Sequence, residues 1–273
     1  MNRDLSLSRP ADRRLAATAA AGGAALFYGF GNFCALAARP DHASVVRINR
    51  LKGRPLGQAG SVTSDPVRLH MAFDWKRVPR GTEPETLTLL MSEFMSLGPI
   101  GFRGPASRIV PEHLTLMDGN VRTVQHITPG VRCRSNLLVG DVLDRLGEDL
   151  LFVTSANRSS HRTGMAEAAH CEMSEIRREF GGRTDAVMIG HFDESANRGR
   201  YPHHVPCSTS IVSFHRDLKV DGRPALLLER QGSLGADTAR KIAARHGFVL
   251  VVTPAAQTRL PVRWPVADRR IAA

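Results

Sequence analysis

Two cations stand two residues apart in the segment Lys52-Gly53-Arg54-Pro55, where a predicted helix ends and a loop begins. The guanidinium fork of an arginine can bond two phosphate oxygens, whereas a lysine acts as a point charge, so the pair suits a di- or triphosphate. Cations in the last turn of a helix also interact favourably with the helix dipole. Taken alone, the segment fits this structural role better than phosphate binding.

A second polar segment follows the apolar strand that we predict at residues 149–154. It reads Thr154-Ser155-Ala156-Asn157-Arg158-Ser159. Open α/β sheets place ligand-binding groups at the carboxyl ends of their strands, so these hydroxyl and amide groups could hold a phosphate or a carboxylate. A turn followed by a helix cap explains the same residue types equally well.

A third polar set lies in the C-terminal half of the chain. A strand with hydroxyl groups, Ser208-Thr209-Ser210-Ile211-Val212, precedes a second strand that ends in Glu229-Arg230-Gln231-Gly232. No Ser-His-Asp or Cys-His pattern typical of nucleophilic catalysis accompanies them. The pairs His170-Cys171 and His203-His204, the latter with Cys207, lack the spacing of a closed zinc site, so we expect no protein-bound metal.

Hydrophobic periodicity and the positions of capping residues predict the elements that must position these side chains. Asp41 caps a helix that ends at Gly53, and Thr82 begins another that stops at Gly98-Pro99. Strands are expected at residues 149–154, 186–190, 209–214, 225–229 and 248–252, and helices at about 138–146, 166–180 and 235–246. This mixture indicates an α/β fold with helices packed on a sheet.

The chain has 273 residues, and 37 Lys and Arg against 26 Asp and Glu give a formal net charge of +11. A hydrophobic fraction of 42% is enough for a substantial core and excludes a disordered chain. Aromatic residues make up only 5%, so the aromatic-studded strands of an RNA-recognition module are not indicated. The charge fits either an arginine-rich solvated surface or a cleft that attracts polyanions such as a nucleoside triphosphate or RNA.

Four widely separated cysteines do not suggest a disulfide framework, and a reducing cytoplasm is the simplest localisation. Residues 15–38 carry no charge and superficially resemble a signal peptide. They are rich in Ala and Gly and too weakly hydrophobic for a membrane span, so we expect no membrane partner. Residues 1–19 are expected to form a flexible basic arm.

The order and spacing of the polar segments resemble the YrdC-like family, whose best-known members are threonylcarbamoyl-AMP synthases. The resemblance covers residues 20–234 and rests most strongly on Lys52-Gly53-Arg54-Pro55 and on residues 154–159. It implies a twisted mixed sheet with packed helices around a large basic cavity. It makes the apolar N-terminal run the first strand and its ligand loop, and it leaves residues 235–273 as a C-terminal helix–strand extension.

Members of this family condense L-threonine, bicarbonate and ATP into threonylcarbamoyl-AMP and pyrophosphate for the threonylcarbamoyl adenosine modification of tRNA, with Mg²⁺ on the ATP. The resemblance therefore implies an ATP-binding nucleotidyltransferase whose partners are ATP, bicarbonate and an amino acid. The implied nucleotide-binding residues are Lys52, Arg54, Gln58, Ser155, Asn157 and Arg230. The implied residues of the amino-acid pocket are Gly31, Thr63, Gln125, Thr154 and Thr209. Attack of a carbamate oxygen on the α-phosphate needs positioning and charge neutralisation, so no catalytic protein nucleophile is expected.

The amino-acid half of the implied pocket departs from the family pattern. An ungapped alignment places Gly29 and Gly31 where the family has threonines, and Phe33 where it has a tyrosine. Gln125 stands where the family has an arginine that, with this loop, binds the amino acid. Loss of a cation opposite a carboxylate lowers affinity by about a hundredfold. We therefore expect the nucleotide half of the pocket to be retained and the acceptor to differ, or catalysis to be lost.

Two other functions remain open from the sequence. The chain could be a non-catalytic module that binds double-stranded RNA or a nucleotide, or its adenylate chemistry could serve carbamoyl transfer, as in larger carbamoyltransferases that contain YrdC-like domains. An RNA-binding protein that contacts many phosphates loses affinity steeply as salt rises, whereas an ATP site would depend strongly on Arg54 alone.

Overall fold

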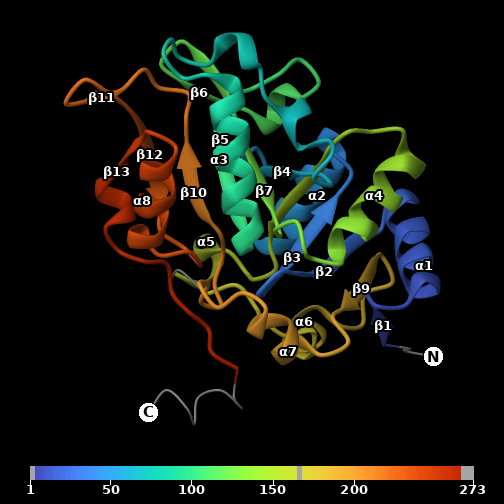
Figure 1. Cartoon of the computed structure of the whole chain (residues 1–273). Coiled ribbons are helices and arrows are strands. Elements are labelled where there is room, and N and C mark those ends of the chain that lie inside the picture. Colours follow the sequence, from blue (N-terminus) through green and yellow to red (C-terminus); the bar gives the residue numbers. More distant parts are fainter. Residues whose placement is uncertain (1–3, 165–167, 266–273) are drawn as a thin grey trace.

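One mixed β-sheet runs through the computed structural model, which describes residues 4–164 and 168–265 (Figure 1). Across the sheet the strands are β1 (Leu5–Ser6), β9 (Ala186–Gly190), β2 (Ala25–Phe30), β3 (Phe33–Ala38), β8 (Leu151–Ser155), β4 (Ser61–Thr63), β7 (Val121–Thr128), β5 (Ile100–Pro105), β10 (Ser210–Ser213), β12 (Arg223–Arg230) and β11 (Lys219–Val220). Two more strands pair with members of this series: β13 (Val249–Val252) with β12, and β6 (Leu116–Asp118) with β7. Parallel and antiparallel pairs both occur, which confirms the α/β fold with a mixed sheet.

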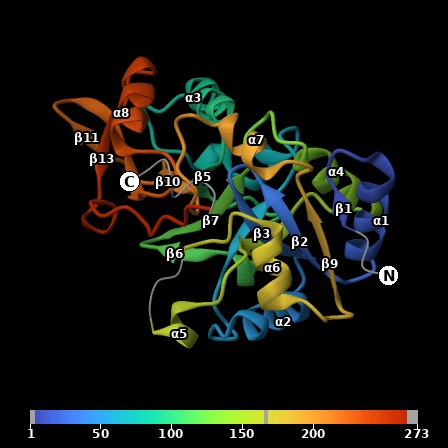
Figure 2. The same cartoon turned by 90° about the horizontal axis from the view of Figure 1, so that it is seen from below.

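Helices pack on both sides of this sheet. Those in the described part of the chain are α1 (Pro10–Ala21), α2 (His42–Lys52), α3 (Pro84–Leu97), α4 (Ser135–Leu146), α5 (Ser160–Thr163), α6 (Met173–Phe180), α7 (Glu194–Gly199) and α8 (Ala236–Arg245). Figures 1 and 2 show α1 and α4 side by side at the end of the molecule opposite α8, β11 and β13. The strong helix expected before Gly98-Pro99 is α3, which begins at Pro84 and ends at Leu97.

Every residue of β2 and β3 is buried, because both faces of this hairpin are covered. Phe27 and Leu36 belong to a core that contains side chains of α2, α3, α6 and α8. Leu26 and Tyr28 belong to a second core, which α1 and α4 complete. Strands buried on two faces have continuous apolar sequences, and this explains the uncharged stretch near the N-terminus. Within the two described ranges, no helix is both long and apolar enough to span a bilayer.

The N-terminal region differs from the flexible arm that the sequence led us to expect. Leu5 and Ser6 pair in parallel with β9, and α1 begins with Pro10 at its first position, where a missing N–H costs nothing. Ala16, Ala17 and Ala20 of α1 are buried among the side chains of α4. The alanine run is therefore the packed face of a helix; residues 1–3 lie outside the described part of the chain.

Two other boundaries also differ from expectation. The long connection expected after Gly53 contains β4 and two short 3₁₀ helices, Leu69–Ala72 and Trp75–Arg77. The helix expected at 166–180 begins only at Met173, and residues 165–167 lie outside the described part. At the C-terminal end α8 and β13 form where a helix and a strand were expected, and Ile242 and Leu250 lie in the same core as α2 and α3.

The hairpin of β2 and β3 leaves no room for side chains at Gly29 in β2 or at Gly31 in the turn, the two glycines that stand where the family has threonines. A Cβ on Gly31, whose φ is +64°, would lie 2.2 Å from Cγ of Pro99. A Cβ on Gly29 would lie 2.5 Å from Cδ2 of His191. The backbone N–H of Gly31 also donates to Sγ of Cys133 at 3.4 Å. In this chain the tip of the hairpin therefore packs directly against Pro99, His191 and Cys133.

We predict that Gly31→Ala lowers the free energy of unfolding more than Gly119→Ala does. Gly119 has a similar φ of +57°, but nothing lies within 4 Å of an added Cβ, so this variant carries only the left-handed backbone cost of about 1–2 kcal/mol. Gly31→Ala adds overpacking against Pro99, for a total of roughly 3 kcal/mol. Urea unfolding of both variants measures the difference, and equal losses would show that the hairpin tip is not tightly packed.

Candidate functional site

A cavity on the sheet is lined by side chains from strands between β3 and β12 and by the loop after α2. Its polar lining comprises three arginines, two glutamines and six hydroxyl residues: Arg54, Arg103, Arg230, Gln58, Gln125, Ser61, Thr123, Thr154, Ser155, Ser208 and Thr209. Its volume is about 170 Å³, below the roughly 300–1,000 Å³ typical of small-molecule sites. A nucleotide would therefore place only part of itself here and extend beyond the cavity.

The local sequence explains how Arg54 reaches this cavity. Asp41 caps α2 by accepting from Ser44 N at 2.9 Å, and the helix ends at Gly53, whose φ of 69° is left-handed. Arg54 N then donates to Asn49 O at 2.8 Å, and Pro55 follows in the loop. The predicted helix from Asp41 to Gly53 is confirmed, and its C-terminal turn directs the next residue to the cavity.

Arg54 and Arg230 are partly buried cations, and neither forms an ion pair with a carboxylate of the residues that the structure describes. Burial lowers the pKa of Arg54 to about 10. Burial also lowers the pKa of Arg230 to about 10; the neighbouring Cys207 raises it, and repulsion from Arg54 lowers it further. Arg230 is held in place by Thr209, whose carbonyl oxygen accepts from Nε at 2.9 Å and whose hydroxyl accepts from Nη2 at 3.1 Å. Desolvated positive charge of this kind favours an anionic ligand.

Lys52, the other cation of the motif, does not line the cavity. Its side chain is fully buried, and Nζ donates to the backbone carbonyl of Ser155 at the end of β8. The carbonyl of Lys52 accepts from Ser159 N at 2.9 Å. Lys52 thus joins the end of α2 to the polar segment that follows β8.

That polar segment is itself ordered by hydrogen bonds. Ser155 Oγ donates to Asn157 Oδ1 at 2.6 Å, and Asn157 Nδ2 donates to Arg158 O at 2.8 Å. Ser155 and Thr154 line the cavity, as does Gln58 from the loop after α2, whereas Asn157 is buried behind Ser155. Of the six implied nucleotide-binding residues, the structure brings Arg54, Gln58, Ser155 and Arg230 to one cavity.

The implied amino-acid pocket is divided in the structure. Gln125, Thr154 and Thr209 line the same cavity as the arginines. Gly31 lies in the packed hairpin turn, and Thr63 is fully buried on β4, so neither lines it. Gln125 Nε2 donates to Ser61 Oγ at 2.6 Å.

Arg103 is a cavity residue that the sequence analysis missed. It lies on β5 directly opposite Gln125 on β7, and its Nη1 donates to Glu229 Oε2 at 2.9 Å. A single charged side chain within the otherwise uncharged strand Ile100–Pro105 was the only signal in the sequence. Its meaning depends on the register of β5 against β7, which sequence alone does not provide.

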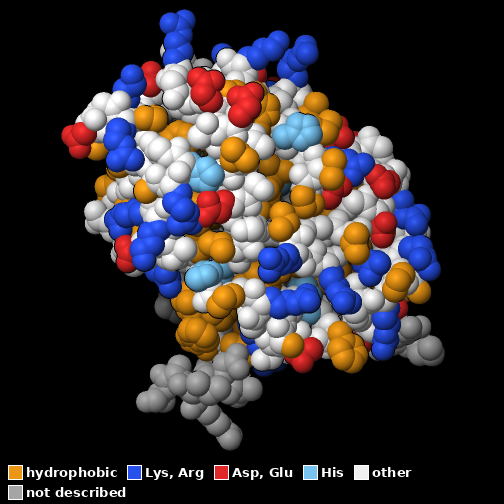
Figure 3. Space-filling view, in the orientation of Figure 1, with side chains coloured by type: hydrophobic (Ala, Val, Ile, Leu, Met, Phe, Trp, Pro, Cys, Tyr) orange, Lys and Arg blue, Asp and Glu red, His pale blue; other side chains and the backbone are white. Residues whose placement is uncertain are grey.

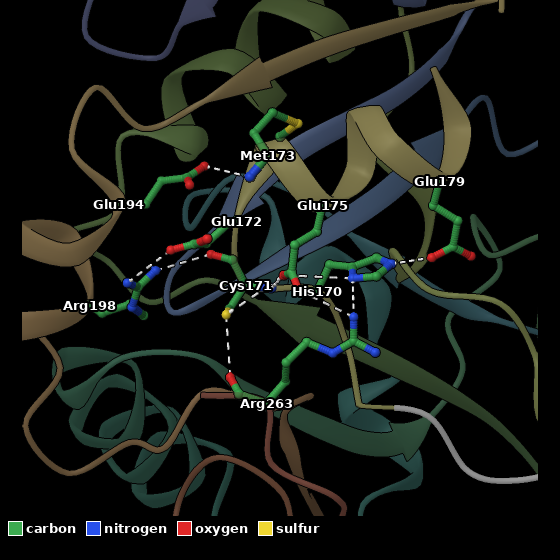
Figure 4. A network of polar contacts seen from close by, with 9 residues as sticks. All are labelled: His170, Cys171, Glu172, Met173, Glu175, Glu179, Glu194, Arg198 and Arg263. Carbon is green, nitrogen blue, oxygen red and sulfur yellow. Dashed lines mark hydrogen bonds and ion pairs between the residues drawn. The ribbon is translucent and has the colours of Figure 1, made fainter. Parts of the chain in front are cut away.

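The histidine and cysteine pairs take part in other contacts. His170 contacts Arg263 and pairs with Glu179, while Glu175 contacts both His170 and Arg263, at 3.7 and 3.4 Å (Figure 4). Burial raises the pKa of Glu175, but bonds from His170 and the charges of His170 and Arg263 outweigh burial and lower it to about 2. This network ties α6 to the C-terminal segment. Over the described ranges, no group of three or more His, Cys, Asp or Glu has an arrangement that could hold a metal ion.

Positive charge also gathers outside the cavity. On the face drawn in Figure 3, Lys and Arg side chains occur in several separate groups with acidic side chains between them. A second hollow is lined by five arginines: Arg47, Arg50, Arg158, Arg162 and Arg183. We call this hollow the arginine groove. Three of its arginines form ion pairs: Arg158 with Glu179 at 3.0 Å, and Arg183 and Arg47 with Asp185 at 2.8 and 3.9 Å.

No protein-family model matches the sequence, and no curated protein sequence matches it. Solved structures do. Sua5 of P. abyssi, crystallised with L-threonine, is 17% identical with a TM-score of 0.62, over 90% of this chain and 60% of that protein. YciO of E. coli is 19% identical with a TM-score of 0.50, over 76% of this chain and 86% of that protein. Full-length HypF, in a phosphate- and nucleotide-bound form, is 16% identical with a TM-score of 0.50, over 80% of this chain and 28% of that protein.

The chain thus spans about 60% of the length of the Sua5 protein that it matches. At these identities the comparison concerns the fold, and it agrees with the mixed sheet and its packed helices. The sequence resemblance is confirmed at that level: the chain has the Sua5/YrdC-like fold.

Proposed function

We propose that this chain binds ATP in the arginine-lined cavity and that its chemistry is the formation of a carbamoyl adenylate. The observation that carries the proposal is that Arg54 and Arg230 line one cavity, lie partly buried, and form no ion pair with a carboxylate that the structure describes. A triphosphate supplies the missing negative charge and accepts the charge-assisted hydrogen bonds that both guanidinium groups can donate.

Further support comes from the ligands of proteins with this fold. The HypF structure is a phosphate- and nucleotide-bound form, and the Sua5 structure holds L-threonine. We extend these two ligand classes to the present chain as a nucleotide and an amino acid or related acid. The same resemblance favours a role in tRNA modification.

In the proposed reaction, bicarbonate and the amine of the acceptor first form a carbamate with loss of water. A carbamate oxygen then attacks the α-phosphorus of ATP, the bond to the β-phosphate oxygen breaks, and pyrophosphate leaves. Arg54 and Arg230 neutralise charge on the phosphates, while Mg²⁺ arrives with ATP as part of the substrate. No step needs a protein nucleophile, because positioning and charge neutralisation suffice.

The remaining polar residues fall into two roles under this proposal. Gln58, Thr154 and Ser155 line the cavity and can donate to phosphate or ribose oxygens. Lys52 and Asn157 are positioning residues, because they hold the carbonyl and the hydroxyl of Ser155.

We predict that Arg54→Ala weakens binding of Mg·ATP by about ten- to a hundredfold, the value of a hydrogen bond to a charged group. Isothermal titration calorimetry measures the affinity, and circular dichroism checks that the variant is folded. Arg50→Ala is the matched control, because Arg50 is exposed at the end of the same helix but does not line the cavity; its affinity should stay within about twofold. If Arg54→Ala bound Mg·ATP with the affinity of the wild type, Arg54 would not be part of the triphosphate site.

The chemistry is tested by release of pyrophosphate from ATP in the presence of bicarbonate and single amino acids. We expect L-threonine to support little release, because Gln125 replaces a cation and Gly29 and Gly31 leave no space for the family's threonines. Another amine-bearing acid should support more. Release with L-threonine that exceeds release with every other acid would contradict the divergence of the acceptor site.

The arginine groove favours a second candidate function, binding of double-stranded RNA. Arg50 and Arg162 are exposed and form no ion pair with any described residue, so they are available to phosphates. If RNA binds here, Arg50→Gln/Arg162→Gln should lower affinity for a 20-base-pair duplex and reduce the slope of log K against log salt by roughly 2. Arg54→Ala should leave RNA binding nearly unchanged. Filter binding from 50 to 300 mM KCl tests this, and an unchanged slope would reject the groove as an RNA site.

A further inference from the structure

Arg103 brings a third cation to the cavity at a place where the sequence suggested that a cation had been lost. The antiparallel register of β5 and β7 puts Arg103 directly opposite Gln125, and both line the cavity. Neighbouring strands lie about 4.8 Å apart. The positive charge of this part of the cavity therefore sits one strand further towards β12 than a cation at position 125 would.

The contacts of Arg103 leave it able to bind a ligand. Nη1 donates to Glu229 Oε2 at 2.9 Å, and this is its one ion pair with a residue that the structure describes. Nε is buried and has no hydrogen-bond acceptor. The side chain as a whole is 21% exposed and lines the cavity, so the rest of the guanidinium group can donate to an incoming oxygen. Gln125 and Ser61 bond to each other and do not compete for Arg103.

The charge around Arg103 distinguishes it from the other two arginines. Among the described residues neither Arg54 nor Arg230 forms an ion pair, whereas Glu229 bonds to Arg103 at 2.9 Å and offsets much of its charge. A triphosphate, which carries several negative charges, is attracted most to the uncompensated pair and is repelled by Glu229. A carboxylate suits Arg103 better than a triphosphate does. It carries one negative charge, and a single guanidinium group can bond both of its oxygens.

Two leucines of the cavity lining lie across β7 from Arg103. Leu116 on β6 pairs with Thr123 on β7, two residues from Gln125, and Leu114 lies just before β6. Both leucines line the cavity. The cavity that contains the cation therefore also offers contact to a hydrocarbon group.

We propose that Arg103 is the specificity-determining residue for the second ligand of this cavity: it binds the carboxylate of an amino acid whose apolar side chain lies against Leu114 and Leu116. The inference rests on the proposed function, because it assigns the acceptor that shares the cavity with ATP. It predicts an acceptor with a larger apolar side chain than that of threonine, held on β5 instead of β7.

The test is calorimetric titration of the full chain with L-leucine, L-valine, L-threonine and L-leucinamide, each with and without saturating Mg·ATP. Leucinamide has the same side chain as leucine but lacks the carboxylate. We expect leucine to bind more tightly than threonine and at least tenfold more tightly than leucinamide. Arg103→Gln should weaken leucine binding at least tenfold and remove the difference between leucine and its amide.

Three further variants keep the result interpretable. Arg108→Gln removes a charge from an exposed arginine outside the cavity and should bind leucine as the wild type does. Arg103→Gln alone leaves the carboxylate of Glu229 without its partner and could fold poorly for that reason. The double variant Arg103→Gln/Glu229→Gln removes both members of the ion pair, and it should lose as much leucine affinity as Arg103→Gln does. Glu229→Gln keeps the guanidinium and should retain the preference for leucine over leucinamide.

The outcomes separate this inference from the proposed function. Wild-type protein that binds none of the three amino acids, or an Arg103→Gln variant that still prefers leucine to leucinamide, overturns the role of Arg103. A loss of ATP affinity in Arg103→Gln as large as in Arg54→Ala also overturns it, because Arg103 would then belong to the triphosphate site. Failure of the wild type to bind ATP while leucine still binds through Arg103 rejects the proposed function and leaves the acid site standing.

Discussion

The cavity depends on two partly buried arginines, Arg54 and Arg230, that form no ion pair with a carboxylate in the described part of the chain. Removing an arginine from water is costly, and protein structures usually offset that cost with a carboxylate. Here backbone and hydroxyl acceptors offset part of the desolvation cost, because Thr209 accepts two hydrogen bonds from Arg230. Arg54 reaches the cavity because α2 ends at a left-handed glycine. An anion in the cavity would offset the positive charge that remains.

Lys52 shows how a residue of the same motif can act without facing a ligand. Its ammonium group is bonded to the carbonyl of Ser155, and its own carbonyl accepts from Ser159, so α2 and the loop after β8 are fixed to each other at two points. Arg54 and Ser155 lie on these two segments. A rigid distance between them matters for a ligand that must touch both, because misplacement of a binding group by about 1 Å can cost a large part of its effect.

The sequence was informative where structure is set locally. Asp41 and Gly53 delimit α2 as predicted, and the apolar runs near residues 186–190 and 248–252 are β9 and β13. The sequence was uninformative where the position or role of a side chain depends on an element distant in the sequence. The alanines of α1 acquire a packed face only from α4, and Arg103 becomes a cavity residue only through the register of β5 with β7. Segments 52–55 and 154–159 are adjacent in space, but which of their side chains turn towards the cavity depends on tertiary contacts.

The packing of the β2–β3 hairpin and the cation on β5 both affect how an acceptor could be bound in the cavity. Pro99 and His191 fill the space that side chains at Gly31 and Gly29 would occupy, so the hairpin cannot extend those side chains to a small polar acceptor. Contacts to the acceptor must then come from elsewhere on the sheet. The residues that line the cavity away from the hairpin include Arg103 on β5, Leu116 on β6 and Leu114 just before β6, so they include a cation and two apolar side chains. Loss of polar contacts at the hairpin and gain of a cation on β5 thus point to the same acceptor, one bound by its carboxylate and its hydrocarbon side chain.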